Sequence, residues 1–152
     1  MALKTGDKIP SFSLPDQNRK IFNVESLLSR KALVIYFYPK DETAGCTKQA
    51  CTFRDSYQDF QDAGAEVIGI SSDSEELHGS FADHYNLPFI LLSDKGGKLR
   101  AQFGVPGNLF GLIPGRVTYI VDKQGIIKFI FNSQIRIDKH IAEALRIIRE
   151  LK

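Results

Sequence analysis

The sequence lacks any apolar run long enough to cross a membrane. Its longest apolar stretches, ALVIYFY at 32–38 and GIIKFIF at 125–131, have the length of buried β-strands. The first ten residues, MALKTGDKIP, also lack the apolar segment of a secretory signal peptide. We therefore expect a soluble, cytoplasmic protein without a membrane partner. The alternative is a plastid protein from which a transit peptide has been removed.

Charge of one sign is not in excess either. Lysine and arginine total 20 against 18 aspartates and glutamates. Because the two signs are interspersed along the chain, no basic patch of the kind that binds nucleic acid is expected. With 43% hydrophobic residues in 152, the chain is long enough for one core and too short for two. We expect a single domain over residues 1–152.

Cysteine is scarce, and the two that occur, Cys46 and Cys51, both lie in the stretch DETAGCTKQAC. Redox CxxC motifs and most zinc sites place two cysteines three positions apart, whereas these are five apart. The histidines that could complete a zinc site form no HxxxH pattern, so we expect no metal and no other cofactor: they are His78, His84 and His140. In a reducing compartment a permanent disulfide is not expected, which leaves a transient redox pair or unrelated core thiols.

Strand-like and helix-like segments alternate along the rest of the chain. Strands are expected at 12–16 and 20–24, as a hairpin, and at 32–39, 65–72, 89–94, 116–122 and 126–132. Helices are expected at 46–60, 74–85 and 138–151, with a capping box formed by Ser72 and Glu75 ahead of the second. This order predicts an α/β, thioredoxin-like fold: a central mixed β-sheet flanked by helices, with an N-terminal β-hairpin. The last helix repeats apolar residues that would pack on the sheet, at Ile137, Ile141, Leu145 and Ile148.

The two cysteines fall on different faces of the expected helix 46–60. At about 100° per residue, Cys51 lies roughly 140° from Cys46. Cys46 shares the inward face with Ala50, Phe53, Tyr57 and Phe60. Ideal helix dimensions place the two Cα atoms about 8.7 Å apart, beyond the roughly 7 Å limit of a disulfide. The two sulfurs can therefore bond only after the first turns of the helix unwind.

Cys46 is expected in the first turn of this helix. There the unpaired N–H groups and the helix dipole favour a thiolate over a thiol. Cys51 lies further along and lacks that activation. A buried, unreactive thiol is the alternative for either residue, and it is the stronger alternative for Cys51.

The spacing of Pro39, Thr43 and Cys46 matches the active-site pattern of Pro, three residues, Thr, two residues, Cys, and so resembles the peroxiredoxins. A second cysteine five residues on is similar to the Q-type subfamily, also called bacterioferritin comigratory proteins. The segments DKIPSFSLPDQ, FRDSYQDFQDAGAEVIGIS, LPFILLSD and GVPGNLFGLIPGRVTYIVD extend the resemblance over nearly the whole chain. One departure is Ala44, where many members have proline, so this loop is less restricted.

The resemblance implies a thiol-dependent peroxidase that reduces hydrogen peroxide and organic hydroperoxides. The Cys46 thiolate would attack the terminal peroxide oxygen and become a sulfenic acid. Cys51 would then form an intramolecular disulfide with Cys46, and thioredoxin or a similar dithiol would reduce it. A monomer is expected.

The resemblance also implies roles for other residues. The Thr43 hydroxyl and the backbone N–H groups near Gly45 and Cys46 would bind the peroxide or the thiolate, and Arg116 would hold both together. Pro39 would shield the sulfur. Without the resemblance, Arg116 would be interpreted as a solvated arginine after a Pro-Gly turn, Thr43 as a helix cap or turn hydroxyl, and Pro39 as the end of a strand.

The loop GVPGNLFGLIPG carries four apolar residues that would line the pocket mouth, dock a reductant or pack on the core: Leu109, Phe110, Leu112 and Ile113. Two other functions are open. One is a general thiol-disulfide oxidoreductase, although the CxxC motif that it needs is absent. The other is a non-enzymatic binding or chaperone domain with the same thioredoxin fold.

Overall fold

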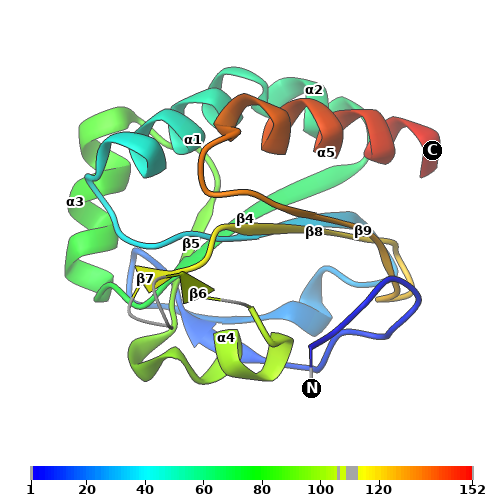
Figure 1. Cartoon of the computed structure of the whole chain (residues 1–152), viewed down its shortest axis with the longest axis horizontal. Coiled ribbons are helices and arrows are strands. Elements are labelled where there is room, and N and C mark those ends of the chain that lie inside the picture. The colour runs from blue at the N-terminus through cyan, green and yellow to red at the C-terminus, as the bar shows by residue number, and fades with distance from the viewer. Residues whose placement is uncertain (1, 106, 109–112, 152) are drawn as a thin grey trace.

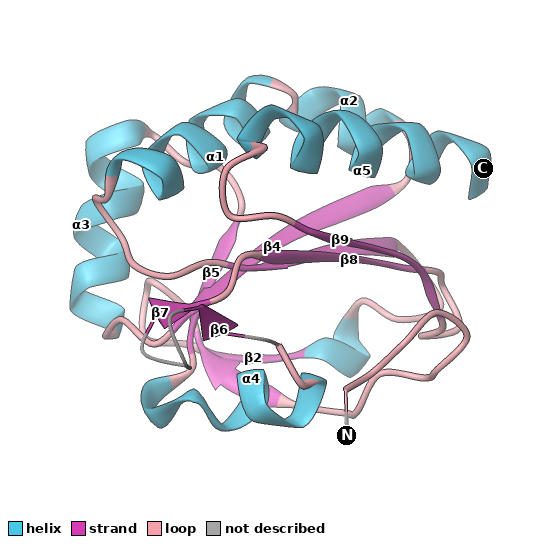
Figure 2. Cartoon of the chain, in the orientation of Figure 1, coloured by secondary structure: helices cyan, strands magenta, loops and turns pink. Residues whose placement is uncertain are grey.

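A five-stranded mixed sheet forms the centre of the molecule (Figure 2). The computed structural model describes residues 2–105, 107–108 and 113–151. The strand order is β5-β4-β3-β8-β9, in which β3, β4 and β5 are parallel and β8 and β9 are antiparallel to their neighbours. The strands are β3 (Ala32–Phe37), β4 (Ala65–Ser71), β5 (Ile90–Ser93), β8 (Val117–Val121) and β9 (Ile127–Asn132). The central mixed sheet expected from the sequence is confirmed.

Within the described residues, two small hairpins and five α-helices surround this sheet. The expected N-terminal hairpin is present as β1 (Ser13–Pro15) and β2 (Ile21–Asn23), and a second one pairs β6 (Gly107–Asn108) with β7 (Ile113–Pro114). The helices are α1 (Ala44–Asp55), α2 (Tyr57–Asp62), α3 (Glu75–Tyr85), α4 (Lys98–Phe103) and α5 (Ile137–Leu151). Two short 3-10 turns, η1 (Val24–Ser26) and η2 (Lys95–Gly97), complete the described elements. No described helix has the length and apolar character to span a bilayer.

The helices divide between the two faces of the sheet. Helices α1, α2 and α5 cover one face, whereas α4 and the N-terminal hairpin lie on the other (Figure 1). Strand β3 is buried on both faces, with Val34 and Tyr36 in the core under α1 and α5, and Leu33 and Ile35 in the opposite core. Each such side chain stabilises the fold by about 1.5–3 kcal/mol when fully buried. Strand β3 is therefore the rigid base from which the cysteine-bearing segment begins.

The expected helix 46–60 is two helices. Helix α1 begins at Ala44, two residues earlier than expected, and ends at Asp55, after which Ser56 (φ −102°, ψ 4°) leaves the helical geometry before α2. Of the expected inward face, Cys46, Ala50, Phe53 and Phe60 are buried, whereas Tyr57 is only partly buried. The break confines both cysteines to one helix of 12 residues.

The expected cap at Ser72 was wrong. Ser74 caps α3 instead, and its hydroxyl oxygen accepts the N–H of Leu77 at 3.2 Å. Glu75 is then the first helical residue and not the third, so it cannot complete a capping box.

Of the apolar loop residues, Leu109, Phe110 and Leu112 lie outside the described residues. Ile113 lies in β7, where its backbone pairs with Asn108.

Candidate active site

Sheet pairing brings three separate segments to the carboxyl end of β3. Phe37, the last residue of β3, pairs with Val117 of the antiparallel strand β8, so Arg116 lies beside the loop that leads into α1. Val117 in turn pairs with Asn132 at the end of β9, which brings the β9–α5 connection to the same place. The central strand register therefore assembles this site from residues about 70 positions apart.

Cys46 is the third residue of α1. The first hydrogen bond of the α-helical type runs from the Thr47 N–H to the Thr43 carbonyl at 2.8 Å. The N–H groups of residues 44–46 lie ahead of it and have no partner within the helix. The first turn also carries no acidic side chain. Cys46 therefore lies at a helix end where uncompensated N–H dipoles favour negative charge.

The guanidinium of Arg116 contacts the cysteine directly. Its Nη2 donates to the Sγ of Cys46 at 3.4 Å, its Nη1 donates to Oε1 of Gln49 at 2.6 Å, and its Nε donates to the Gln134 carbonyl at 3.3 Å. Arg116 is only 5% exposed. The interpretation of Arg116 as a solvated arginine is therefore wrong, because the side chain is buried and all three of its nitrogens donate hydrogen bonds within the protein.

The charge of Arg116 acts on Cys46. The three acceptors around the guanidinium are a sulfur, an amide oxygen and a backbone carbonyl, none of them a carboxylate. No carboxylate is among these contacts, so the positive charge of the guanidinium lies directly against the sulfur without being neutralised. Cys46 is itself 1% exposed, so little water screens this charge. The contact distinguishes Cys46 from a cysteine packed only among apolar side chains.

Sequence reasoning missed Gln49. It lies three residues after Cys46 in α1 and is fully buried, so both side chains share one helix face. Its neutral amide oxygen orients the Arg116 guanidinium without neutralising it, which leaves the positive charge available to the sulfur. The i, i+3 spacing was visible in the sequence, but the partner across the sheet was not.

Gly45 makes room for the same guanidinium. A Cβ at this position would lie 3.0 Å from Nη2 of Arg116 and 3.8 Å from Cδ1 of Ile137. Gly45 therefore contributes to the site by leaving space for the guanidinium, in addition to any role of its backbone N–H.

Gly45→Ala should slow the reaction of Cys46 with peroxide by about tenfold, because the new methyl displaces the guanidinium. The free energy of unfolding should change little, because two effects oppose each other. Alanine favours a helix over glycine by about 1 kcal/mol, whereas its methyl group crowds the guanidinium. Stopped-flow peroxide kinetics and urea unfolding measure the two effects separately. Ala44→Gly, at an exposed position of the same turn, is the matched control. An unchanged rate in Gly45→Ala would show that the guanidinium position does not matter.

Thr43 and Pro39 both lie in the loop between β3 and α1. Thr43 is exposed, and its hydroxyl donates to the Lys40 carbonyl at 2.8 Å, so in this structure it acts as a turn hydroxyl and is not bonded to Cys46. It is the N-terminal residue flanking α1, but its side chain makes no capping bond. Pro39 is half-buried and follows β3 by two residues.

A buried polar cluster anchors the loop between β3 and α1. Oδ2 of Asp41 lies 2.6 Å from Nδ1 of His78, and its Oδ1 accepts the Tyr38 hydroxyl at 2.6 Å. Nε2 of His78 lies 2.9 Å from the Leu92 carbonyl, which only accepts, so this nitrogen carries a proton. The cluster joins the loop ahead of Cys46 to helix α3.

The same cluster includes the described residues whose donor atoms could hold a metal ion. Oxygen or nitrogen atoms of Asp41, Asp73 and His78 lie within 4.8 Å of one another. Each is already used in hydrogen bonding, since Oδ2 of Asp73 accepts the Asp41 N–H at 2.8 Å and the Ser71 hydroxyl at 2.7 Å. Hydrogen bonding accounts for their proximity without an ion.

Arg100 of α4 is a second arginine that sequence reasoning missed. Its Nη2 donates to the Tyr38 carbonyl and its Nη1 to the Gly115 carbonyl, both at 2.9 Å. These carbonyls precede the Cys46 loop and Arg116 respectively. Burial lowers the pKa of Arg100 from its usual value, but the group remains a cation at neutral pH. Arg100 therefore ties together the two segments that carry Cys46 and Arg116.

Both cysteines are free thiols, and α1 is continuous through them. Cys51 is partly exposed, whereas Cys46 is buried. A continuous helix keeps the two side chains on different faces, so the structure corresponds to the reduced form.

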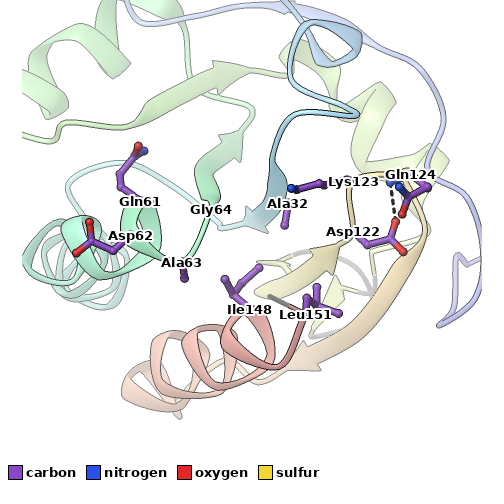
Figure 3. A pocket seen from close by; sticks show the side chains of 10 residues that line it. All are labelled: Ala32, Gln61, Asp62, Ala63, Gly64, Asp122, Lys123, Gln124, Ile148 and Leu151. Atoms are coloured by element: carbon purple, nitrogen blue, oxygen red, sulfur yellow. Dashed lines mark hydrogen bonds between the residues drawn. The ribbon is translucent and has the colours of Figure 1, made fainter.

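A cavity of about 430 Å³ lies elsewhere, at the amino ends of β3 and β4 (Figure 3). Ile148 and Leu151 of α5 face it, and Gln61, Asp122 and Lys123 are among its other lining residues. Neither cysteine lines this cavity. Cys46 and Arg116 lie instead at the opposite, carboxyl end of β3.

The chain is similar to known proteins over nearly its whole length. Residues 5–130 match the AhpC/TSA family. The chloroplastic peroxiredoxin Q of Sedum lineare is 52% identical over 147 residues, which cover 97% of this chain and 78% of that protein. The crystal structure of peroxidoxin BcpB from Mycobacterium tuberculosis superposes with a TM-score of 0.91 at 36% identity, covering 99% of each chain.

A third similar protein is the bacterioferritin comigratory protein of Xanthomonas campestris, whose structures were described for its alkyl peroxide reduction activity. It matches with a TM-score of 0.85 at 25% identity, over 95% of this chain and 98% of that one. These likenesses confirm the thioredoxin-like fold and the resemblance to Q-type peroxiredoxins that the sequence indicated.

Proposed function

Because the chain belongs to the AhpC/TSA family, we propose that it is a thiol-dependent peroxidase in which the Sγ of Cys46 attacks the peroxide. The observation that carries this proposal is the contact between Nη2 of Arg116 and that sulfur. It pairs a nucleophile at a helix N-terminus with a buried cation, which is the environment that makes a cysteine reactive.

The first step oxidises the sulfur by two electrons. The Cys46 thiolate attacks the terminal oxygen of the hydroperoxide, an S–O bond forms and the O–O bond breaks. The remaining oxygen leaves as water or an alcohol after taking up a proton, and the cysteine becomes a sulfenic acid. Charge shifts toward the leaving oxygen, where Arg116 and the free N–H groups of residues 44–46 can stabilise it. The Thr43 hydroxyl is proposed to bind peroxide once its bond to the Lys40 carbonyl is exchanged, and Pro39 to shield the sulfur.

The second step joins the two cysteines. The Cys51 thiolate attacks the sulfenic sulfur, a disulfide forms and the oxygen leaves as water. Helix α1 must unwind for this. The break at Ser56 separates α1 from α2, and the Tyr57 hydroxyl holds α2 to Glu66 of β4 at 2.7 Å. With Asp41 anchored at the other end of the segment, unwinding can stay between these two fixed points.

The proposal has three further features, which concern the reductant, the oligomeric state and the compartment. Thioredoxin or a similar dithiol is proposed as the reductant, because an intramolecular disulfide is reduced by dithiol exchange. The protein is proposed to act as a monomer. The curated relatives are named as chloroplastic proteins, which favours the plastid alternative over the cytoplasm.

Two rival functions make different predictions. A general thiol-disulfide oxidoreductase would reduce insulin without peroxide. Such an enzyme needs a CxxC motif, and the Cys46–Cys51 spacing does not provide one. A binding or chaperone domain would leave peroxide untouched.

A coupled assay separates these functions. Oxidation of NADPH by thioredoxin reductase, thioredoxin and this protein is followed with hydrogen peroxide or cumene hydroperoxide, and insulin reduction is followed without peroxide. We expect NADPH oxidation that depends on peroxide and negligible insulin reduction. Insulin reduction with no peroxide consumption would refute the proposed peroxidase function. Peroxide consumption that is supported only by a monothiol would refute the proposal that a dithiol such as thioredoxin is the reductant.

A further inference from the structure

His140 is a buried histidine that the proposed reaction does not use. It is the fourth residue of α5 and has no exposed surface. Its ring stands edge-on to Phe131 of β9, with the ring centroids 4.7 Å apart at 89°. Its hydrogen bonds and its ring contact go to Thr118, Ser133 and Phe131 and not to Cys46, so any effect on the reaction must pass through another residue.

Both imidazole nitrogens are hydrogen-bonded. Nε2 lies 2.7 Å from the Ser133 carbonyl, which only accepts, so Nε2 carries the proton. Nδ1 lies 2.7 Å from the Thr118 hydroxyl and accepts from it. Burial lowers the pKa of His140 to about 4, and the nearby Arg116 acts in the same direction. At neutral pH the ring is therefore an uncharged, fixed donor to Ser133.

The residue that receives this bond belongs to the segment that holds Arg116. The Ser133 N–H donates to the Arg116 carbonyl at 3.2 Å, and the next residue, Gln134, accepts Nε of Arg116 through its carbonyl at 3.3 Å. Arg116 is thus held by this segment at its backbone and at its side chain. The two Nη atoms are left for Gln49 and Cys46.

We propose that His140 is a positioning residue for the peroxidase reaction. By holding the Ser133 carbonyl, it fixes the Gln134 carbonyl and thereby aims the Arg116 guanidinium at the sulfur of Cys46. This inference rests on the proposed function of Cys46 and Arg116, and it adds a residue on α5 to that site. His140 touches neither peroxide nor sulfur.

The test compares two substitutions at this position. His140→Leu removes the donor, whereas His140→Gln keeps an N–H that can reach the Ser133 carbonyl and an oxygen that can accept from Thr118. The measurement is the second-order rate constant of Cys46 oxidation by hydrogen peroxide in stopped flow. We expect His140→Leu to be slower by about tenfold and His140→Gln to remain within about threefold of the parent.

A double-mutant cycle separates positioning from general loosening of the fold. If His140 acts through Arg116, His140→Leu should change the rate by less than about twofold once Arg116 has been replaced by alanine. Ile148→Val, a buried change on the same helix, is the control for a weakened α5 and should leave the rate unchanged. Circular dichroism establishes that each variant is folded at the assay temperature.

The outcomes are distinct. Equal tenfold losses with and without Arg116, or an unchanged rate in His140→Leu, would overturn the positioning role. If the parent protein does not lose its Cys46 thiol to peroxide at all, the proposed function fails and not this inference alone. Non-additive losses with recovery in His140→Gln would support it.

Discussion

Cys46→Ser is expected to lower the rate of peroxide reduction by at least about 10⁴-fold, the scale seen when the nucleophile of an enzyme is removed. A serine hydroxyl at this position is hardly ionised at neutral pH, and its oxygen cannot be oxidised by peroxide. The fold should persist, because serine and cysteine differ by one atom of similar size and Arg116 can donate to either. The measurement is steady-state peroxide consumption with excess thioredoxin.

Cys51→Ser is the matched control for that substitution. It changes the same atom five residues away in the same helix but leaves Cys46 and Arg116 in contact. Its first turnover should keep the parent rate, and only recycling should fail. Rapid peroxide turnover by Cys46→Ser would refute the assignment of the attacking sulfur.

Arg116→Lys should slow the oxidation of Cys46 by about 10²-fold, although the positive charge is kept. The guanidinium serves Cys46, Gln49 and Gln134 with three nitrogens in one plane. A lysine ammonium is a single point and cannot keep this geometry. It also provides fewer aligned donors for charge on the leaving oxygen, and one such donor is worth about 10²–10³ in rate. Stopped-flow oxidation of the reduced protein measures the effect directly.

The control for charge and length is Arg149→Lys, an exposed position on α5 far along the helix from the site. It should react at the parent rate. If Arg116→Lys also reacts at the parent rate, the planar donor geometry has no role and charge alone suffices. A loss in both variants would point to a general effect of the substitution on the protein.

The strands of the sheet could be predicted from the sequence because their signal is local. The run ALVIYFY has no polar interruption, and a strand buried on both faces needs none; it became β3. The break between α1 and α2 could not be predicted in the same way. Ser56 interrupts a helical stripe that continues through Phe60, so the periodicity alone favours a single helix. Helix α4 has only six residues, too few for a periodic signal.

The reacting sulfur could be predicted from the sequence, but its surroundings only in part. Cys46 is identified by its position at a helix start and by the motif around it, and Arg116 only by resemblance. Gln49 is part of the site because it contacts Arg116, which is 67 residues away in the sequence. His140 is part of it because it contacts Ser133 in the β9–α5 connection. No spacing within one element encodes such contacts, since the pairing of β3, β8 and β9 creates them.

The central claim is that one helix keeps the two thiols apart until the first has been oxidised. Reduced protein is mixed with one equivalent of hydrogen peroxide, quenched with acid at successive times and weighed intact by mass spectrometry. We expect the mass of one oxygen atom to be gained first and then replaced by the loss of two hydrogens, with the disulfide mapped to Cys46 and Cys51. In Cys51→Ser the oxygen adduct should persist. A disulfide that forms in the parent with no preceding oxygen adduct at any time, or an adduct on Cys51, would contradict this account.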